Sequence, residues 1–112
     1  MYSLEFIKGT LKPIILKLLT NNKRMYGYQI VQIVKELTKE QLQLTEGALY
    51  PALHQLVEEG LLNTESENIG KRKRIYYSLS KVGKSEAPRR VNEMINFINI
   101  MQIIFGIKPQ EI

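Results

Sequence analysis

The side chains with the clearest chemistry form one run of adjacent cations, from Lys71 to Arg74. The chain has 16 basic and 11 acidic residues, so the balance outside this run is 12 to 11, and nearly all of the net charge of +5 comes from it. Adjacent cations repel one another, and nucleic-acid phosphates would neutralise them. The run therefore predicts a site for a polyanion. Charge alone also allows RNA, an anionic membrane, or a solvated turn that protects a strand edge.

Residues for other kinds of chemistry are scarce. The sequence has no cysteine or aspartate, and His54 is its single histidine. Zinc sites of the Cys/His kind and Ser-His-Asp triads therefore cannot be built within one subunit. We expect neither an enzyme nor a metal or other cofactor. The N-terminus shows no signal-peptide pattern, and residues 94–107 are too short and too polar for a membrane span of ~20 residues, so we expect a cytoplasmic protein without a membrane partner.

Three helices are predicted before the basic run. Apolar residues recur at helical spacing after Thr10 and again from 26 to 38. The third helix has Thr45 as its N-cap and Gly60 as its stop. Its leucines define a buried side, which leaves a small, aromatic and imidazole surface on the other side. We expect Pro51 to kink this helix or loosen its first turn.

Two strands and a last helix follow. Residues 61–67 and 75–79 have strand character and are joined by a predicted loop over 68–74 that holds the cations. Ser80 can cap a final helix, broken or bent at Pro88. The fold class is mainly α (α+β): a winged helix-turn-helix over 1–80, with a two-stranded wing, and an added C-terminal dimerisation helix over 81–112, in one compact unit.

The apolar face of the last helix is too wide for a domain of this size to cover, so a second copy is the expected cover. The predicted dimer-interface residues are Val91, Met94, Ile95, Ile98, Met101 and Phe105.

Three segments carry a resemblance to a known family. Residues 26–30 (YGYQI), 45–53 (TEGALYPAL) and 74–80 (RIYYSLS) occur in the order and at the intervals of the PadR family of bacterial transcriptional regulators. The resemblance covers roughly residues 10 to 85. It implies a winged-helix DNA-binding protein, and in some members a dimer-interface cavity for aromatic effectors. Here that pocket would be lined by Phe97, Met94, Met101 and Phe105.

In a helix-turn-helix, the N-terminal residues of the second helix approach the base edges in the major groove, and the helix before it crosses the backbone. Tyr50 and Tyr28 could instead pack between the two helices, and His54 could be an ordinary surface residue. The predicted DNA-binding residues are Tyr26, Tyr28, Thr45, Glu46, Gly47, Tyr50, His54, Lys71, Arg72, Lys73 and Arg74.

The function predicted from these features is a homodimeric, sequence-specific regulator that binds double-stranded DNA. Two-fold symmetry would place two recognition helices about 34 Å apart, which favours an inverted-repeat operator. A repressor is the simplest mode because a small dimer can exclude polymerase directly, and an aromatic effector could relieve it. The alternative is a winged helix that docks proteins or binds nucleic acid without sequence preference.

Overall fold

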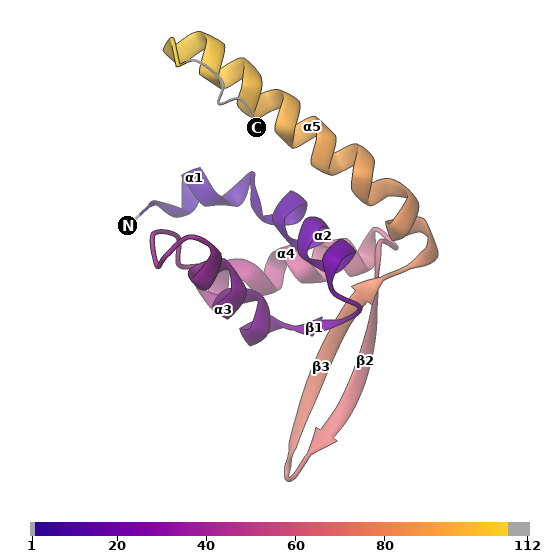
Figure 1. Ribbon diagram of the computed structural model, residues 1–112. Coiled ribbons are helices and arrows are strands. Elements are labelled where there is room, and N and C mark those ends of the chain that lie inside the picture. Colours follow the sequence, from indigo (N-terminus) through magenta and orange to yellow (C-terminus); the bar gives the residue numbers. More distant parts are fainter. Residues whose placement is uncertain (1, 108–112) are drawn as a thin grey trace.

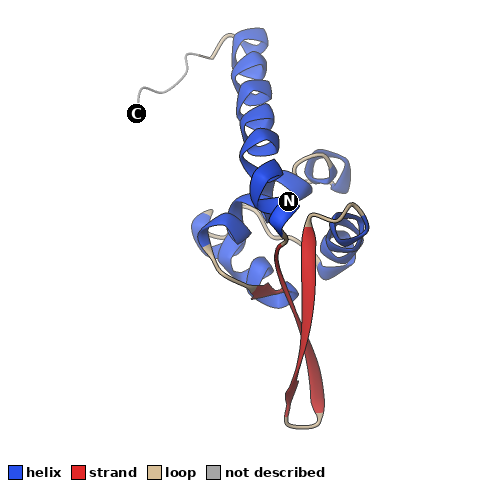
Figure 2. Ribbon diagram, turned by 90° about the vertical axis from the view of Figure 1, so that its right-hand side faces the viewer, coloured by secondary structure: helices blue, strands red, loops and turns tan. Residues whose placement is uncertain are grey.

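The computed structural model describes residues 2–107. Helices α1 to α4 form a body from which the β2–β3 hairpin and α5 extend in opposite directions (Figures 1 and 2). This arrangement confirms the predicted winged helix-turn-helix with an added C-terminal helix. In chain order the elements are α1 (Leu4–Lys8), α2 (Leu11–Asn21), β1 (Met25–Tyr26), α3 (Gly27–Leu37), α4 (Glu46–Glu58), β2 (Leu62–Ile69), β3 (Arg72–Leu79) and α5 (Lys81–Phe105).

The core lies where α2, α3 and α4 turn their apolar faces toward one another. Burying a leucine or isoleucine stabilises the fold by about 1.5–3 kcal/mol, so these side chains decide which face of each helix is left for solvent. The largest fully buried side chains are Ile15, Leu16, Ile30, Leu49, Leu53 and Leu56. Because the last three belong to α4, the opposite face of α4 points outward.

The two helices that have a proline beyond their first turn are continuous. Helix α4 includes Pro51 and α5 includes Pro88, so the break at Pro88, one of the two predicted outcomes, does not occur. A proline removes one helical hydrogen bond, and the bonds on either side maintain the helix. Ser80 caps α5 as predicted, because its hydroxyl accepts from the Gly83 N–H at 2.9 Å, whereas the Thr10 side chain makes no cap hydrogen bond at the start of α2. Residues 108–112, the end of the predicted dimerisation segment, lie outside the described residues.

The wing differs from its prediction. Strands β2 and β3 pair in antiparallel fashion up to Ile69 and Arg72, leaving a turn of only Gly70 and Lys71. Gly70 has a φ of +62°, the left-handed conformation that a two-residue hairpin turn needs at its first position. The predicted loop over 68–74 is therefore wrong, and three of the four cations belong to β3. Charged residues at these positions hide the alternation of apolar and polar side chains from which a strand is predicted, and pairing between β2 and β3 extends both strands through them.

Two short elements had no counterpart in the predicted order. Helix α1 is capped by Ser3 and anchored by Ile7, which is buried in the core. Strand β1 pairs with β3, Met25 opposite Tyr77 and Tyr26 opposite Tyr76, so β3 is the central strand of a three-stranded sheet in the order β1-β3-β2. The wing is thereby tied to the start of α3.

Candidate nucleic-acid interface

Helix α4 presents the predicted outward face. The Thr45 hydroxyl accepts from the Ala48 N–H at 3.2 Å and caps the helix, with Glu46 in the first turn. Gly47 and His54 are exposed, and a methyl group added at Gly47 would meet no atom within 4 Å. The N-terminal half of α4 is therefore open to a large partner.

Tyr50 lies differently from the other predicted contacts on α4. Its ring is half-buried and covers Gly27, where an added Cβ would be 2.5 Å from the Tyr50 hydroxyl oxygen. Burial, and then the charge of Glu46, raise the pKa of the Tyr50 phenol. Tyr50 thus packs at the junction of α3 and α4, as the alternative to DNA contact in the sequence analysis had it. A contact between its hydroxyl and a phosphate stays a prediction.

Tyr26 and Tyr28 flank the first residue of α3. Tyr26 is the N-cap, and its backbone N–H donates to the Gln29 side chain at 3.3 Å. Tyr28 is exposed, and its hydroxyl accepts from the Gln32 amide at 2.7 Å. Both residues therefore lie at the N-terminal end of α3, where Tyr50 of α4 covers Gly27.

The cations of the wing are divided by the pleat of β3. Paired residues in antiparallel strands share a face, so Arg74 lies with Glu67, while Lys73 lies with Asn68 on the face of the buried Tyr77. Lys71 occupies the turn. Among the ion pairs of residues 2–107, none involves the run from Lys71 to Arg74. These cations are available to an external anion.

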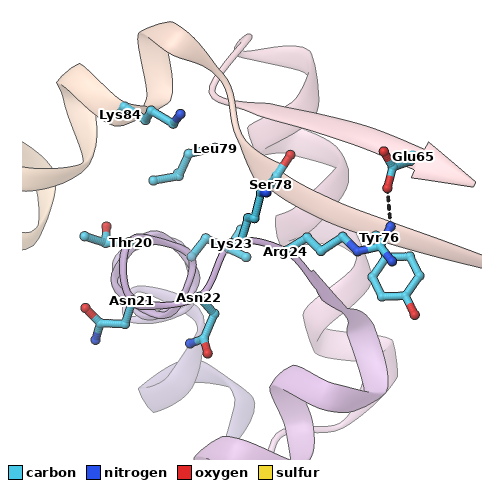
Figure 3. A pocket seen from close by; sticks show the side chains of 11 residues that line it. Thr20, Asn21, Asn22, Lys23, Arg24, Glu65, Tyr76, Ser78, Leu79 and Lys84 are labelled. Carbon is cyan, nitrogen blue, oxygen red and sulfur yellow. Dashed lines mark hydrogen bonds and ion pairs between the residues drawn. The ribbon is translucent and has the colours of Figure 1, made fainter.

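Arg24, which the sequence analysis did not single out, organises the base of the wing. Its guanidinium binds the carboxylates of Glu65 and Glu67 on β2 and lies 3.8 Å from the ring centroid of Tyr76. The bond to Glu67 is the first of the interactions that raise the pKa of Arg24. Figure 3 shows the guanidinium between Glu65 and the Tyr76 ring, at one end of a hollow of about 710 Å³.

A second row of contacts continues on the same face. The Tyr76 ring meets the ring of Tyr26 edge to face, with centroids 5.5 Å apart, and the Arg74 guanidinium lies 4.1 Å from the Tyr26 ring centroid. Such cation–π contacts contribute about 0.5–1 kcal/mol each at exposed sites. The contacts thus run Arg24–Tyr76–Tyr26–Arg74, with an arginine at each end of a tyrosine pair, and no spacing along the chain reveals this order.

The wing and the helix-turn-helix enclose a hollow of about 300 Å³. It brings together five of the predicted DNA-binding residues, whereas Tyr28, Thr45, Glu46, Gly47, His54 and Lys71 do not line it. Its lining is Tyr26, Gly27, Tyr50, Ile69, Arg72, Lys73, Arg74 and Ile75. Phenol and guanidinium groups at one open hollow suit the oxygens of a phosphate backbone.

The distal part of α5 presents an apolar surface. Ile95, Ile98 and Phe105 are exposed, whereas Val91 packs against the core. Four residues predicted from the sequence as a pocket line one hollow of about 450 Å³ beside α2, together with Gln102, whose side-chain oxygen is buried without a hydrogen-bond partner in the described part of the chain. The four are Met94, Phe97, Met101 and Phe105.

No group of three or more histidine, cysteine or acidic residues that could hold a metal ion occurs among residues 2–107. Within the same residues, no helix is both long and apolar enough to cross a membrane.

Comparison with known proteins decides the family. Residues 15–89 match the model of the transcriptional regulator PadR-like family. The chain belongs to this family. Its members are transcriptional regulators rather than enzymes, in agreement with the expectation that this chain is not an enzyme. The match confirms the resemblance seen in residues 26–30, 45–53 and 74–80, all of which lie within it.

Solved PadR-family structures resemble this chain over most of its length. A PadR-like transcription factor from Bacteroides fragilis is 32% identical, with a TM-score of 0.65 over 84% of this chain and 94% of that one. Bacillus subtilis PadR, solved in complex with operator DNA, is 25% identical, with a TM-score of 0.63 over 91% of this chain but only 49% of that one.

Two further proteins are similar to nearly the whole chain. A transcriptional regulator from Clostridium thermocellum has the same fold, with 24% identity and a TM-score of 0.77 over 91% of this chain and 96% of that one. An uncharacterised protein from Lysinibacillus sphaericus is 29% identical over 102 residues, which is 88% of this chain and 91% of its own length.

Proposed function

We propose that this chain is a sequence-specific, double-stranded-DNA-binding regulator. One observation carries the proposal: Arg72, Lys73 and Arg74 of the wing, which have no ion pair in the described part of the chain, line one hollow with Tyr50 of α4, a helix whose N-terminal residues are exposed. A helix of this kind enters the major groove, while cations at its side grip phosphates. Bacillus subtilis PadR is similar to this chain and was solved in complex with operator DNA, which supports DNA binding here.

We assign a proposed DNA contact to each residue from its position in the structure. Thr45, Glu46, Gly47 and His54 approach the base edges, because they lie on the open side of α4. At Gly47 the absence of a side chain allows the backbone to come close. Tyr26, Tyr28 and Tyr50, near the start of α3, contact the sugar-phosphate backbone, as do the wing cations. The Tyr50 hydroxyl reaches phosphate from the hollow beside the wing.

We propose a homodimer assembled through α5. Ile103, Ile104 and Phe105 are 75%, 65% and 72% exposed, and a monomer that leaves them in water forgoes the stabilisation that burial supplies. A two-fold dimer presents two copies of α4 and fits an inverted-repeat operator. Acting in the cytoplasm, the dimer represses by occupying promoter DNA.

A ligand site on α5 is a second proposal. The hollow beside Met94, Phe97, Met101 and Phe105 is apolar, apart from the unpartnered Gln102 oxygen. An aromatic effector with a hydroxyl or amine donor would satisfy that oxygen and release repression if it favoured the dimer arrangement that fits the operator less well. Phenol titrated into the repressor–DNA complex tests this. An unchanged operator affinity at saturating phenol contradicts it for this ligand class.

The first experiment measures binding to the DNA upstream of the protein's own gene and to a scrambled duplex, at several salt concentrations. We expect preference for the upstream duplex. Replacing Lys71 to Arg74 by alanine should lower the slope of log affinity against log salt by about 0.9 for each phosphate that the wing no longer neutralises. Equal binding to both duplexes would indicate a nonspecific nucleic-acid binder, and no binding to either would favour a protein-docking module.

A further inference from the structure

The wing carries acidic as well as basic side chains, and Arg24 forms ion pairs with two of the acidic ones, Glu65 and Glu67. Its Nη2 atom is 2.8 Å from the Glu67 carboxylate, and its Nη1 atom binds Glu65. These are the ion pairs of both glutamates in the described part of the chain. Arg24 does not belong to the wing: it lies before β1 and reaches across to β2 past the central strand (Figure 3).

Glu67 also lies beside the most enclosed cation of the wing. Arg74 is its cross-strand partner, so the two side chains share a face of the hairpin. Arg74 is held over the Tyr26 ring at 4.1 Å and lines the hollow between the wing and the helices. Glu67 therefore stands between two guanidinium groups, and Arg24 is the one to which it is hydrogen-bonded.

We propose that Arg24 is a positioning residue for DNA binding, which acts by occupying Glu65 and Glu67 so that Arg74 is left free to bind phosphate. Without Arg24, Glu67 would turn to Arg74, and Glu65 would add an uncompensated negative charge beside the DNA. The inference rests on the proposed function of the wing. Arg24 itself does not line the hollow at which the phosphate is expected.

The proposal predicts a particular pattern of affinities. Arg24→Gln should weaken binding to the upstream duplex at least about tenfold, the scale of one charge-assisted hydrogen bond, and lower the salt slope by about 0.9. Glu65→Gln/Glu67→Gln should bind as tightly as the unsubstituted protein or more tightly. Once the two glutamates are neutral, removal of Arg24 should have little further effect, so the triple variant should match the double variant.

Matched controls come from α5. Arg89 likewise binds two glutamates, Glu86 and Glu93, at 2.6 and 3.2 Å, on a helix outside the proposed DNA interface. Arg89→Gln and Glu86→Gln/Glu93→Gln make the same changes in net charge and should alter DNA affinity less than twofold. Melting curves of every variant at one protein concentration establish that each is folded. Arg24 is 40% exposed in its side chain, so its replacement should leave the fold intact.

Each result has a distinct meaning. If Arg24→Gln binds as the unsubstituted protein does, the proposal is overturned. If Glu65→Gln/Glu67→Gln weakens binding as much as Arg24→Gln does, the three residues form only a mechanical brace. If Arg24→Gln in the double-variant background still costs tenfold, Arg24 contacts DNA itself. Failure of the unsubstituted protein to bind any duplex would overturn the proposed function as well, which separates that outcome from the other three.

Discussion

Replacing Gly83 by alanine should destabilise the fold through a clash with the backbone. Gly83 lies in the first turn of α5, where its N–H donates to the Ser80 hydroxyl. Ser80 in turn donates from its N–H to the Leu61 carbonyl at 2.9 Å and from its hydroxyl to the Gly60 carbonyl at 2.6 Å. A Cβ at Gly83 would overlap the Leu61 carbonyl oxygen, so α5 could not remain docked at this corner.

The magnitude follows from three contributions. Overpacking against a fixed group costs about 1–3 kcal/mol. Lengthening the Ser80–Leu61 hydrogen bond costs about 1 kcal/mol, and alanine in place of glycine in a helix returns roughly 0.5–1 kcal/mol. The net loss is about 2 kcal/mol, which lowers the melting temperature by roughly 8–12 °C in a domain of this size.

Thermal unfolding followed by circular dichroism, at one protein concentration, measures this loss. Gly47→Ala is the matched control: it makes the same change in the first turn of α4, where the added methyl meets nothing within 4 Å. The control should melt at or slightly above the temperature of the unsubstituted protein. If Gly83→Ala melts with its control, the close packing of α5 on Leu61 does not stabilise the fold and the reasoning is wrong.

Three more predictions concern the ion pairs of Glu59, the turn of the wing and the exposed face of α4. Glu59 binds Lys12 and Arg90, each at 2.9 Å, and these bonds, Lys12 first, lower its pKa. Glu59→Gln should therefore lower the free energy of unfolding by about 1 kcal/mol at pH 7. This difference from the unsubstituted protein should persist at every pH above the ordinary glutamate pKa of about 4.3 and disappear as the pH falls through the lowered pKa of Glu59 in the folded protein. Thermal melts of both proteins from pH 7 to pH 3 test this pH dependence. Gly70→Val forces a β-branched residue to a φ of +62°, a local cost of about 1–2 kcal/mol, so amide exchange in the wing should accelerate while the melting temperature hardly changes. Gly47→Ala should weaken DNA binding while the protein remains folded, and unchanged binding would remove the close-approach role of this glycine.

Local signals explain which elements could be predicted. The limits of α4 depend on Thr45, whose hydroxyl caps the helix, and on Gly60, which has a φ of +78° just past its end. Both effects act within a few residues, so the sequence contains them. The alternation of Ile75, Tyr77 and Leu79 likewise marked part of β3, because only one face of that strand reaches the core.

Other features depend on partners distant in the chain. Met25 and Tyr26 form a strand only because β3 lies beside them, and two residues carry no periodicity. The role of Arg24 depends on the register that places Glu65 and Glu67 on the face of Tyr76. Tyr50 had the right spacing for an outward position, yet the missing side chain of Gly27 gives its ring a place to pack. Helical spacing alone allowed the Tyr50 ring either to face solvent or to pack on α3, and the contact with Gly27 determines that it packs.

The central position of β3 limits how the wing can change in length. Tyr77 is buried in the core, and Arg74 lies three residues away toward the tip. Since side chains alternate between faces, one residue inserted between them would carry Arg74 to the other side of the sheet and move Tyr26 out of its reach. Residues added at Gly70 and Lys71 would leave that face unchanged. We therefore expect insertions and deletions among natural relatives to gather at the tip and to be absent from the base.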